Sequence, residues 1–208
     1  VIPLSQNAMI NASPLTQTFP LFRDKSGIYH FPDTISVFGE FGFAMNVVDK
    51  REGTNNIYQF HRAELIVDGN LEFELSYDRI PFKHGKFAKT MIEYDLKRKN
   101  LGEFQKLYRL PEHKKMSIHS LDNTGILGLA PGVHSVEIRI FDAQENKTIV
   151  KGTVAATFPM TLEANEIFRD GKVVILALSP KRGGLAIRDA VVYSFTKYGF
   201  ADKKVEII

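Results

Sequence analysis

The 208 residues of this chain include no cysteine and no tryptophan. Without cysteine, the chain has neither a disulfide framework nor a thiolate metal site. This absence fits a protein of a reducing cytosol and equally a bacterial envelope protein that folds without disulfides. Long apolar runs are also missing, because no stretch approaches the roughly 18 to 20 residues of a membrane-spanning helix. We therefore expect a chain without a transmembrane segment.

A signal-peptide pattern is absent as well, since no positively charged stretch followed by an apolar stretch opens the chain. The first residue is Val1 rather than methionine. We therefore expect a mature form or a fragment of a longer protein.

The chain carries only a small net charge. The chain has 27 Lys and Arg against 24 Asp and Glu, which gives a net charge of +3. This mild basicity is spread along the chain, so it fits an anionic envelope surface and is only a weak argument for nucleic acid. We therefore expect no nucleic-acid partner. The 16 Phe and seven Tyr residues indicate aromatic-rich packing between strands.

Most of the secondary structure that the sequence predicts is β-strand. Alternating apolar and polar residues predict a hairpin at 134–154, with Asp142 accepting backbone N–H bonds at its polar tip. A second hairpin is predicted about Asp68-Gly69, a turn that requires positive φ. The best helical candidate is 88–108, with one short helix near 91–99 that Gly102 ends. After Ala156 the strand pattern starts again and continues to the last residue.

Metal and nucleophile signatures are missing from the sequence. The six histidines are scattered: His30, His61, His84, His113, His119 and His134. His61 with Glu64, and His134 with Glu137, are three apart on predicted strands and therefore face opposite sides. Oxygen-rich loops at 49–56 and 142–146 are better explained as solvated turns than as calcium sites. No Gly-x-Ser-x-Gly elbow occurs. We predict no catalytic residue, no metal and no cofactor.

One segment interrupts the strand pattern with cations beside aromatic rings, and we select it as the candidate partner-contact region, against the alternative of a solvated linker. It extends from Ile92 to Leu110. Its candidate contact residues are Tyr94, Lys97, Arg98, Lys99, Phe104, Lys106, Tyr108 and Arg109.

Five stretches in order carry a family resemblance over about residues 27–154: "GIYHFPDTISVFGEFGFAMNVVD", "AELIVDGNLEFELSYDRIPF", "IEYDLKRKN", "FQKLYRLPEHKKMSIH" and "GVHSVEIRIFDAQENKTIVKGTV". This series resembles the region that follows the catalytic domain in bacterial envelope proteins of the M23 (LytM-like, lysostaphin-type) zinc peptidase family. The family's peptidase motifs, His-x-x-x-Asp and His-x-His, do not occur in the chain. The resemblance therefore implies an accessory part of such a protein and no peptidase activity of its own.

The resemblance implies a mainly β chain with an Ig-like antiparallel β-sandwich and one short helix. We divide the chain into a Pro-rich lead segment at 1–33, the sandwich at 34–156, and a partial second β unit or an extension at 157–208. The implied location is the bacterial periplasm or cell envelope, and the implied partners are a catalytic peptidase domain or the cell wall.

Two other functions stay open. One is a carbohydrate-binding or carbohydrate-cleaving sandwich, which requires exposed aromatic residues on one face. The candidates for that face are Phe41, Tyr58, Phe73, Tyr77 and Tyr94. The other is an adhesin or assembly module that pairs by strand addition, suggested by the strand-like end at 205–208.

Overall fold

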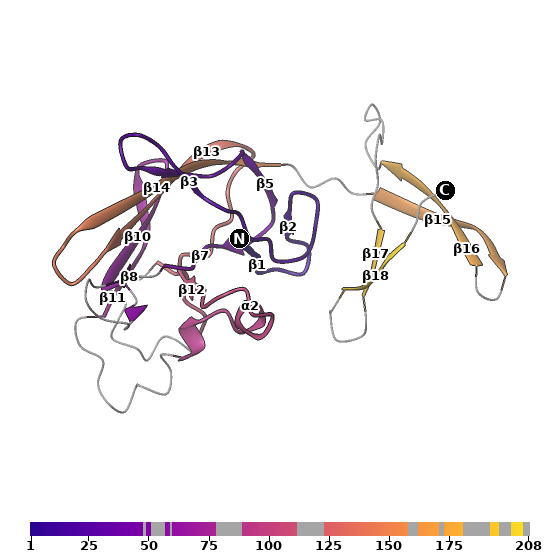
Figure 1. Ribbon diagram of the computed structural model, residues 1–208. Helices are drawn as coiled ribbons and strands as arrows, with labels where there is room; N and C mark the ends of the chain where they lie inside the picture. The colour runs from indigo at the N-terminus through magenta and orange to yellow at the C-terminus, as the bar shows by residue number, and fades with distance from the viewer. Residues whose placement is uncertain are drawn as a thin grey trace. The chain divides into compact units, whose positions relative to one another are not determined.

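The computed structural model describes residues 1–47, 49–50, 57–58, 60–77, 89–111, 123–157, 162–170, 173–180, 192–195 and 201–205. The chain splits into two compact units, Val1–Thr157 and Phe158–Ile208. Both are built from β-strands (Figure 1), which confirms the predicted mainly β class. A strand that the sequence pattern predicts at 114–121 lies outside the described residues. Of the oxygen-rich loop predicted at 49–56, residues 49–50 form a short strand instead, and 51–56 lie outside the described residues.

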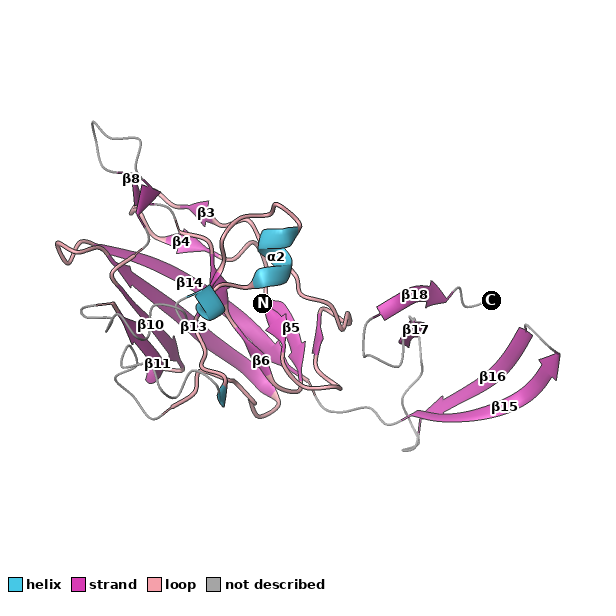
Figure 2. Ribbon diagram, turned by 90° about the horizontal axis from the view of Figure 1, so that it is seen from below, coloured by secondary structure: helices cyan, strands magenta, loops and turns pink. Residues whose placement is uncertain are grey.

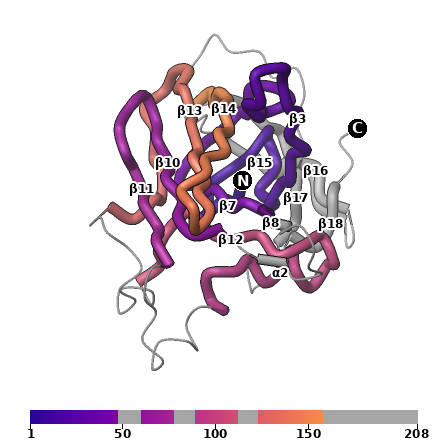
Figure 3. The backbone as a smooth tube through the Cα atoms, turned by 60° about the vertical axis from the view of Figure 1, so that its left-hand side comes forward, coloured from indigo at the N-terminus to yellow at the C-terminus, as the bar shows by residue number. Residues whose placement is uncertain are grey.

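The largest sheet belongs to the first unit and has the strand order β11-β10-β13-β14-β4-β3. Its long strands run side by side in Figures 2 and 3. The strands of this path are β3 (Phe22–Arg23), β4 (Tyr29–His30), β10 (Arg62–Val67), β11 (Asn70–Ser76), β13 (Gly132–Phe141) and β14 (Lys147–Ala156). Two further strands extend the sheet: β5 (Ile35–Phe38) pairs with β14, and β2 (Met9–Ile10) pairs with β5.

Short strand pairs complete the first unit. They are β1 (Ile2–Pro3) with β6 (Phe41–Gly42), β7 (Ala44–Met45) with β12 (Gln105–Lys106), and β8 (Asp49–Lys50) with β9 (Ile57–Tyr58). All three pairs are antiparallel.

The second unit contains two antiparallel pairs among its described residues. β15 (Leu162–Asp170) pairs with β16 (Val173–Pro180), and β17 (Val192–Phe195) pairs with β18 (Ala201–Val205). The strand pattern that starts again after Ala156 predicts strands at 172–179 and 186–199, and β16 and β17 are found there.

The β13–β14 hairpin is the longest pairing of the first unit, from Gly132 opposite Ala156 to Phe141 opposite Lys147. At its tip, Asp142 Oδ1 accepts the backbone N–H groups of Gln144 at 2.8 Å and Asn146 at 2.9 Å. The predicted bracing role of Asp142 is confirmed.

The Asp68-Gly69 hairpin is also confirmed. It joins β10 to β11, and Asp68 and Gly69 have φ values of 50° and 82°. Positive φ at both central residues is the geometry that matches the twist of two strands joined by a two-residue turn.

The outer edge of β14 carries parallel pairings, which the predicted antiparallel pattern did not include. Val150 lies opposite Tyr29 of β4, and Val154 lies opposite Ile35 of β5. Between these two pairings the Phe31 N–H donates to the Lys151 carbonyl at 3.0 Å. Residues from the predicted lead segment at 1–33 thus belong to the main sheet.

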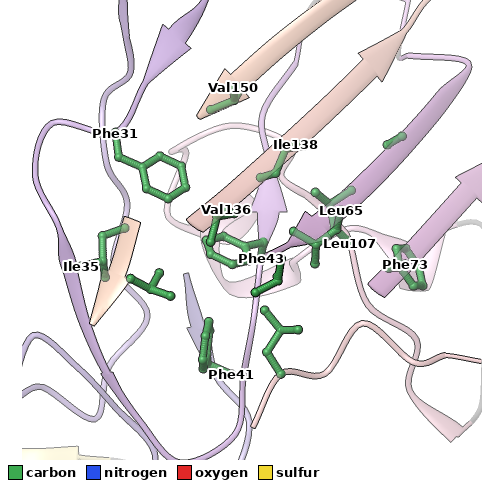
Figure 4. Close-up of a cluster of buried hydrophobic side chains, with 14 of the residues drawn as sticks. Phe31, Ile35, Phe41, Phe43, Leu65, Phe73, Leu107, Val136, Ile138 and Val150 are labelled. Carbon is green, nitrogen blue, oxygen red and sulfur yellow. The ribbon is translucent and has the colours of Figure 1, made fainter. Parts of the chain in front are cut away.

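The core lies on one face of this sheet. Alternate residues of each strand are buried there, such as Leu65 of β10 and Ile138 of β13, both at 0 % exposure. Aromatic rings cover them (Figure 4): Phe31 stacks on Phe43 with ring centroids 5.9 Å apart, and Phe41 meets Phe43 edge-on at 5.8 Å. Period-two alternation therefore separates a buried face from a solvent-facing one.

The predicted short helix is present as α2 (Tyr94–Arg98), preceded by a 3-10 turn at Lys89–Met91. It ends before Gly102, because Asn100 already has a positive φ of 57°. Of its five residues, only Leu96 is buried. In the described part of the chain, no helix has the length and apolarity to cross a membrane.

Candidate functional site

The candidate contact segment divides into an exposed helical half and a largely buried strand half. In the helical half, Tyr94 is 69 % exposed, and the side chains of Lys97 and Arg98 are 51 % and 65 % exposed. Lys99, which caps the carboxyl end of α2, is also exposed. Four of the eight predicted contact residues are therefore available at the surface of one short helix.

In the strand half, Tyr108 and Lys106 make contacts within the fold. Tyr108 is 1 % exposed, and its hydroxyl donates to Glu93 Oε2 at 3.4 Å. Lys106 donates from Nζ to the Thr90 carbonyl at 3.1 Å and lies 3.8 Å from Glu93. Burial, together with the nearby Glu93 charge, raises the pKa of Tyr108 well above its ordinary value. Through these contacts Lys106 of β12 and the nearby Tyr108 bind the turn before α2. Little of either side chain is therefore exposed for a partner to contact.

The remaining two predicted contact residues, Phe104 and Arg109, are half-buried. Phe104 lines the pocket described below, whereas Arg109 donates its backbone N–H to the Thr124 carbonyl at 2.6 Å. Neither belongs to the exposed surface of α2.

Acidic residues balance part of the charge on α2. Lys97 Nζ lies 2.5 Å from Glu103 Oε1, and Arg98 lies 3.7 Å from Asp95. Lys99 makes no ion pair with the residues that the structure describes. Exposed ion pairs of this kind contribute only about 0–1 kcal/mol, so an anionic partner can replace these acidic residues at little cost.

A pocket of about 300 Å³ lies beside α2. Leu96 of α2 and Phe104 form one part of its wall, and β4, β5 and β7 contribute others. Most of the lining is apolar: Val1, Ile2, Phe19, Leu21, Tyr29, Phe31, Ile35, Phe43, Ala44, Met45, Leu96 and Phe104. Gln17, Thr18 and Asn46 complete it. Sequence patterns did not reveal this pocket, because its wall joins residues from Val1 to Phe104 that only the folded chain brings together.

The solvent-facing side of the main sheet carries a network of alternating charges. It joins six side chains from β10, β13, β14 and the β13–β14 tip: Arg62, Glu64, Glu137, Arg139, Glu145 and Lys151. Arg139 lies 2.6 Å from Glu137 and 3.5 Å from Glu64. Partial burial is the largest single effect and would raise the pKa of Glu137, but the hydrogen bonds and charges of Arg139 and Lys151 together outweigh it and lower the pKa.

His134, one of the predicted half-buried or surface histidines, bridges two chain segments. Its Nδ1 lies 2.6 Å from Asp68 Oδ2, and its Nε2 lies 2.7 Å from the Ala130 carbonyl oxygen. Both neighbours are acceptors, so both ring nitrogens can donate only when the imidazole is protonated. The hydrogen bond to Asp68 is the main cause that raises the pKa of His134.

We predict that the His134 bridge makes stability depend on pH. Because the folded-state pKa is raised, the bridge contributes fully below the ordinary histidine pKa of about 6.5 and is lost as the pH rises through the folded value. The urea midpoint should therefore fall between pH 6 and pH 9, and fall less in His134→Gln. Equal pH dependence of the two proteins would contradict this role.

The aromatic face considered for carbohydrate binding does not form as expected. Phe41 and Phe73 are 0 % and 1 % exposed, so neither can belong to an exposed aromatic platform. Tyr77 is half-buried against the core, and the Tyr58 side chain lies outside the described residues. Among the described residues, no three His, Asp or Glu side chains are grouped as metal ligands. His84, His113 and His119 lie outside them, so the absence of a metal stays a prediction.

Comparisons with protein-family models, with curated proteins and with solved structures yield no match for this chain.

Proposed function

We propose that the chain is a non-catalytic accessory module of a bacterial cell-envelope protein, which positions or regulates a LytM-like cell-wall peptidase. The exposed surface of α2, with Tyr94 beside Lys97, Arg98 and Lys99, is the observation that carries the binding role. The partner is the catalytic peptidase domain or the wall itself, and the place of action is the periplasm or cell envelope.

Two features of α2 support a binding role. The helix has only five residues and one buried side chain, so most of its surface is not used by the fold. An exposed aromatic ring beside cations offers apolar contact together with attraction for carboxylates, and aromatic residues and arginine are enriched where proteins bind one another. The peptidase connection itself rests on the five stretches that resemble the LytM-like proteins.

The test is a pull-down against purified wall sacculi and, separately, against a LytM-like catalytic domain. We expect the unmodified chain to bind one of them and the triple variant Lys97→Glu, Arg98→Glu, Lys99→Glu to lose at least tenfold in affinity. The control changes Lys25 and Lys147 to Glu, because these exposed lysines reverse charge in the same way away from α2 and outside the charge network. The control should bind like the parent.

Two outcomes would contradict the proposal. Binding that the α2 variant retains would remove this helix from the interaction. Hydrolysis of sacculi by the purified chain would refute the accessory role, because cleavage by this peptidase family requires a metal-activated water.

A further inference from the structure

The pocket beside α2 borders the core of the first unit, where the side chains of Leu65, Phe41 and Ile138 are 0 % exposed. Protein interiors contain few voids larger than a water molecule. A space of about 300 Å³ falls at the lower end of the range for small-molecule sites, which are also mainly apolar. Its size suits one slender ligand rather than a folded partner.

The residues that line the pocket limit the kind of ligand that it can bind. Five aromatic rings face the space, and Met45 adds a flexible side chain that adapts to ligand shape. The polar lining residues are Gln17, Thr18 and Asn46, together with the N-terminal ammonium of Val1. The Gln17 side chain is already engaged, because its Nε2 donates to the Ile10 carbonyl at 2.7 Å and its Oε1 accepts from Asn11 at 3.3 Å, and the Val1 ammonium donates to the Gln17 carbonyl at 2.8 Å. Because most of the wall is apolar, the enclosed part of a ligand must be mainly apolar.

Cations lie near this wall. The Arg23 guanidinium carbon is 5.9 Å from the centre of the Tyr29 ring, which lines the pocket. Arg23 is exposed, as are Lys97 and Lys99 on the same helix as the lining residue Leu96. A ligand with a negative headgroup could keep its charge in water near these cations while its tail is enclosed.

We propose that the pocket binds the aliphatic chain of an anionic amphiphile, with the headgroup held outside near Arg23. The ligand chemistry is a single unbranched acyl or alkyl chain on a carboxylate or phosphate, and its source is either a free fatty acid or a phospholipid. This site is independent of the proposed envelope function, since it requires neither a peptidase nor the wall.

Calorimetric titration of the full chain with saturated fatty acids below their micellar concentrations tests the proposal. Hexanoate, octanoate and decanoate should bind progressively more tightly, by about fourfold for each added methylene while the chain still fits, since each buried methylene contributes a nearly constant increment. Arg23→Glu should weaken decanoate at least fivefold and leave uncharged decanol unchanged.

Ala44→Phe is the blocking variant, because Ala44 lines the pocket. It should weaken decanoate at least tenfold. Ala143→Phe is the matched control, because Ala143 is exposed at the β13–β14 tip, away from the pocket. This variant should bind decanoate like the parent. Melting curves show whether the Ala44→Phe variant is folded. If it is not, the chain-length series with the parent protein and the Arg23→Glu variant test whether the pocket binds the aliphatic chain.

Titration with vesicles of anionic phospholipid separates the two sources. Binding of fatty acids alone identifies a free acid as the ligand, and vesicle binding that Ala44→Phe weakens identifies a phospholipid; either supports the proposal. No saturable binding, affinity independent of chain length, or equal affinity in a folded Ala44→Phe variant would overturn it.

Discussion

Gly152→Val is expected to lower the free energy of unfolding by about 3 kcal/mol, at the upper end of the usual cost of overpacking a core. Gly152 lies in β14, directly beneath the Phe31 ring, and a Cβ at this position would overlap ring atoms of Phe31. The ring cannot move away freely, because it is also stacked on Phe43. Urea unfolding followed by circular dichroism measures the change.

Gly128→Val is the matched control for this prediction. A Cβ at Gly128 has no neighbour within 4 Å, so the same substitution should stay within about 0.5 kcal/mol of the parent. Phe31→Leu, combined with Gly152→Val, should cost less than the sum of the single changes, since the smaller side chain gives way to valine. A parent-like midpoint for Gly152→Val would mean that Phe31 does not pack on β14.

Gly69→Val should cost about 1–3 kcal/mol for a different reason. A Cβ at Gly69 would meet no atom within 4 Å, so crowding plays no part. The cost comes from the backbone, because Gly69 has a φ of 82° and a β-branched residue strongly avoids this region. The midpoint of urea unfolding again provides the measurement.

Gly69→Asn separates backbone strain from the mere loss of a glycine. Asparagine adopts positive φ more readily than other non-glycine residues. The asparagine variant should therefore retain most of the parent's stability. If Gly69→Val melts like the parent, the turn between β10 and β11 does not have the geometry described above.

Features set by neighbouring residues were predictable from the sequence. The turn at Asp68-Gly69 and the tip at Asp142 depend on a few adjacent residues whose backbone preferences are strong. Leu96 as the buried residue of α2 follows in the same way from one apolar position among charged ones. These local signals gave the mainly β class, two hairpins and the short helix correctly.

Features set by distant residues were not predictable. Nothing in the short stretches around Tyr29 and Ile35 indicates that they pair in parallel with β14, because the partner is chosen by the folded sheet. The same holds for the contact segment, where the Tyr108 ring is buried against Gly42 of β6 although the sequence around it resembles an exposed basic linker. The pocket and the charge network likewise depend on which strands become neighbours.

The parallel pairing along β14 also determines the order in which the first unit can assemble during synthesis. The Thr157 N–H donates to the Val37 carbonyl, and these residues are 120 positions apart. β4 and β5 leave the ribosome early and can pair with β3 and β2, but the edge that joins both to the long strands is missing until β14 has followed. At about 5–20 residues per second this takes several seconds or more. During that interval Phe31 and Ile35 lack the β14 neighbours that help to bury them in the folded unit, and transiently exposed apolar surface of this kind is prone to aggregation.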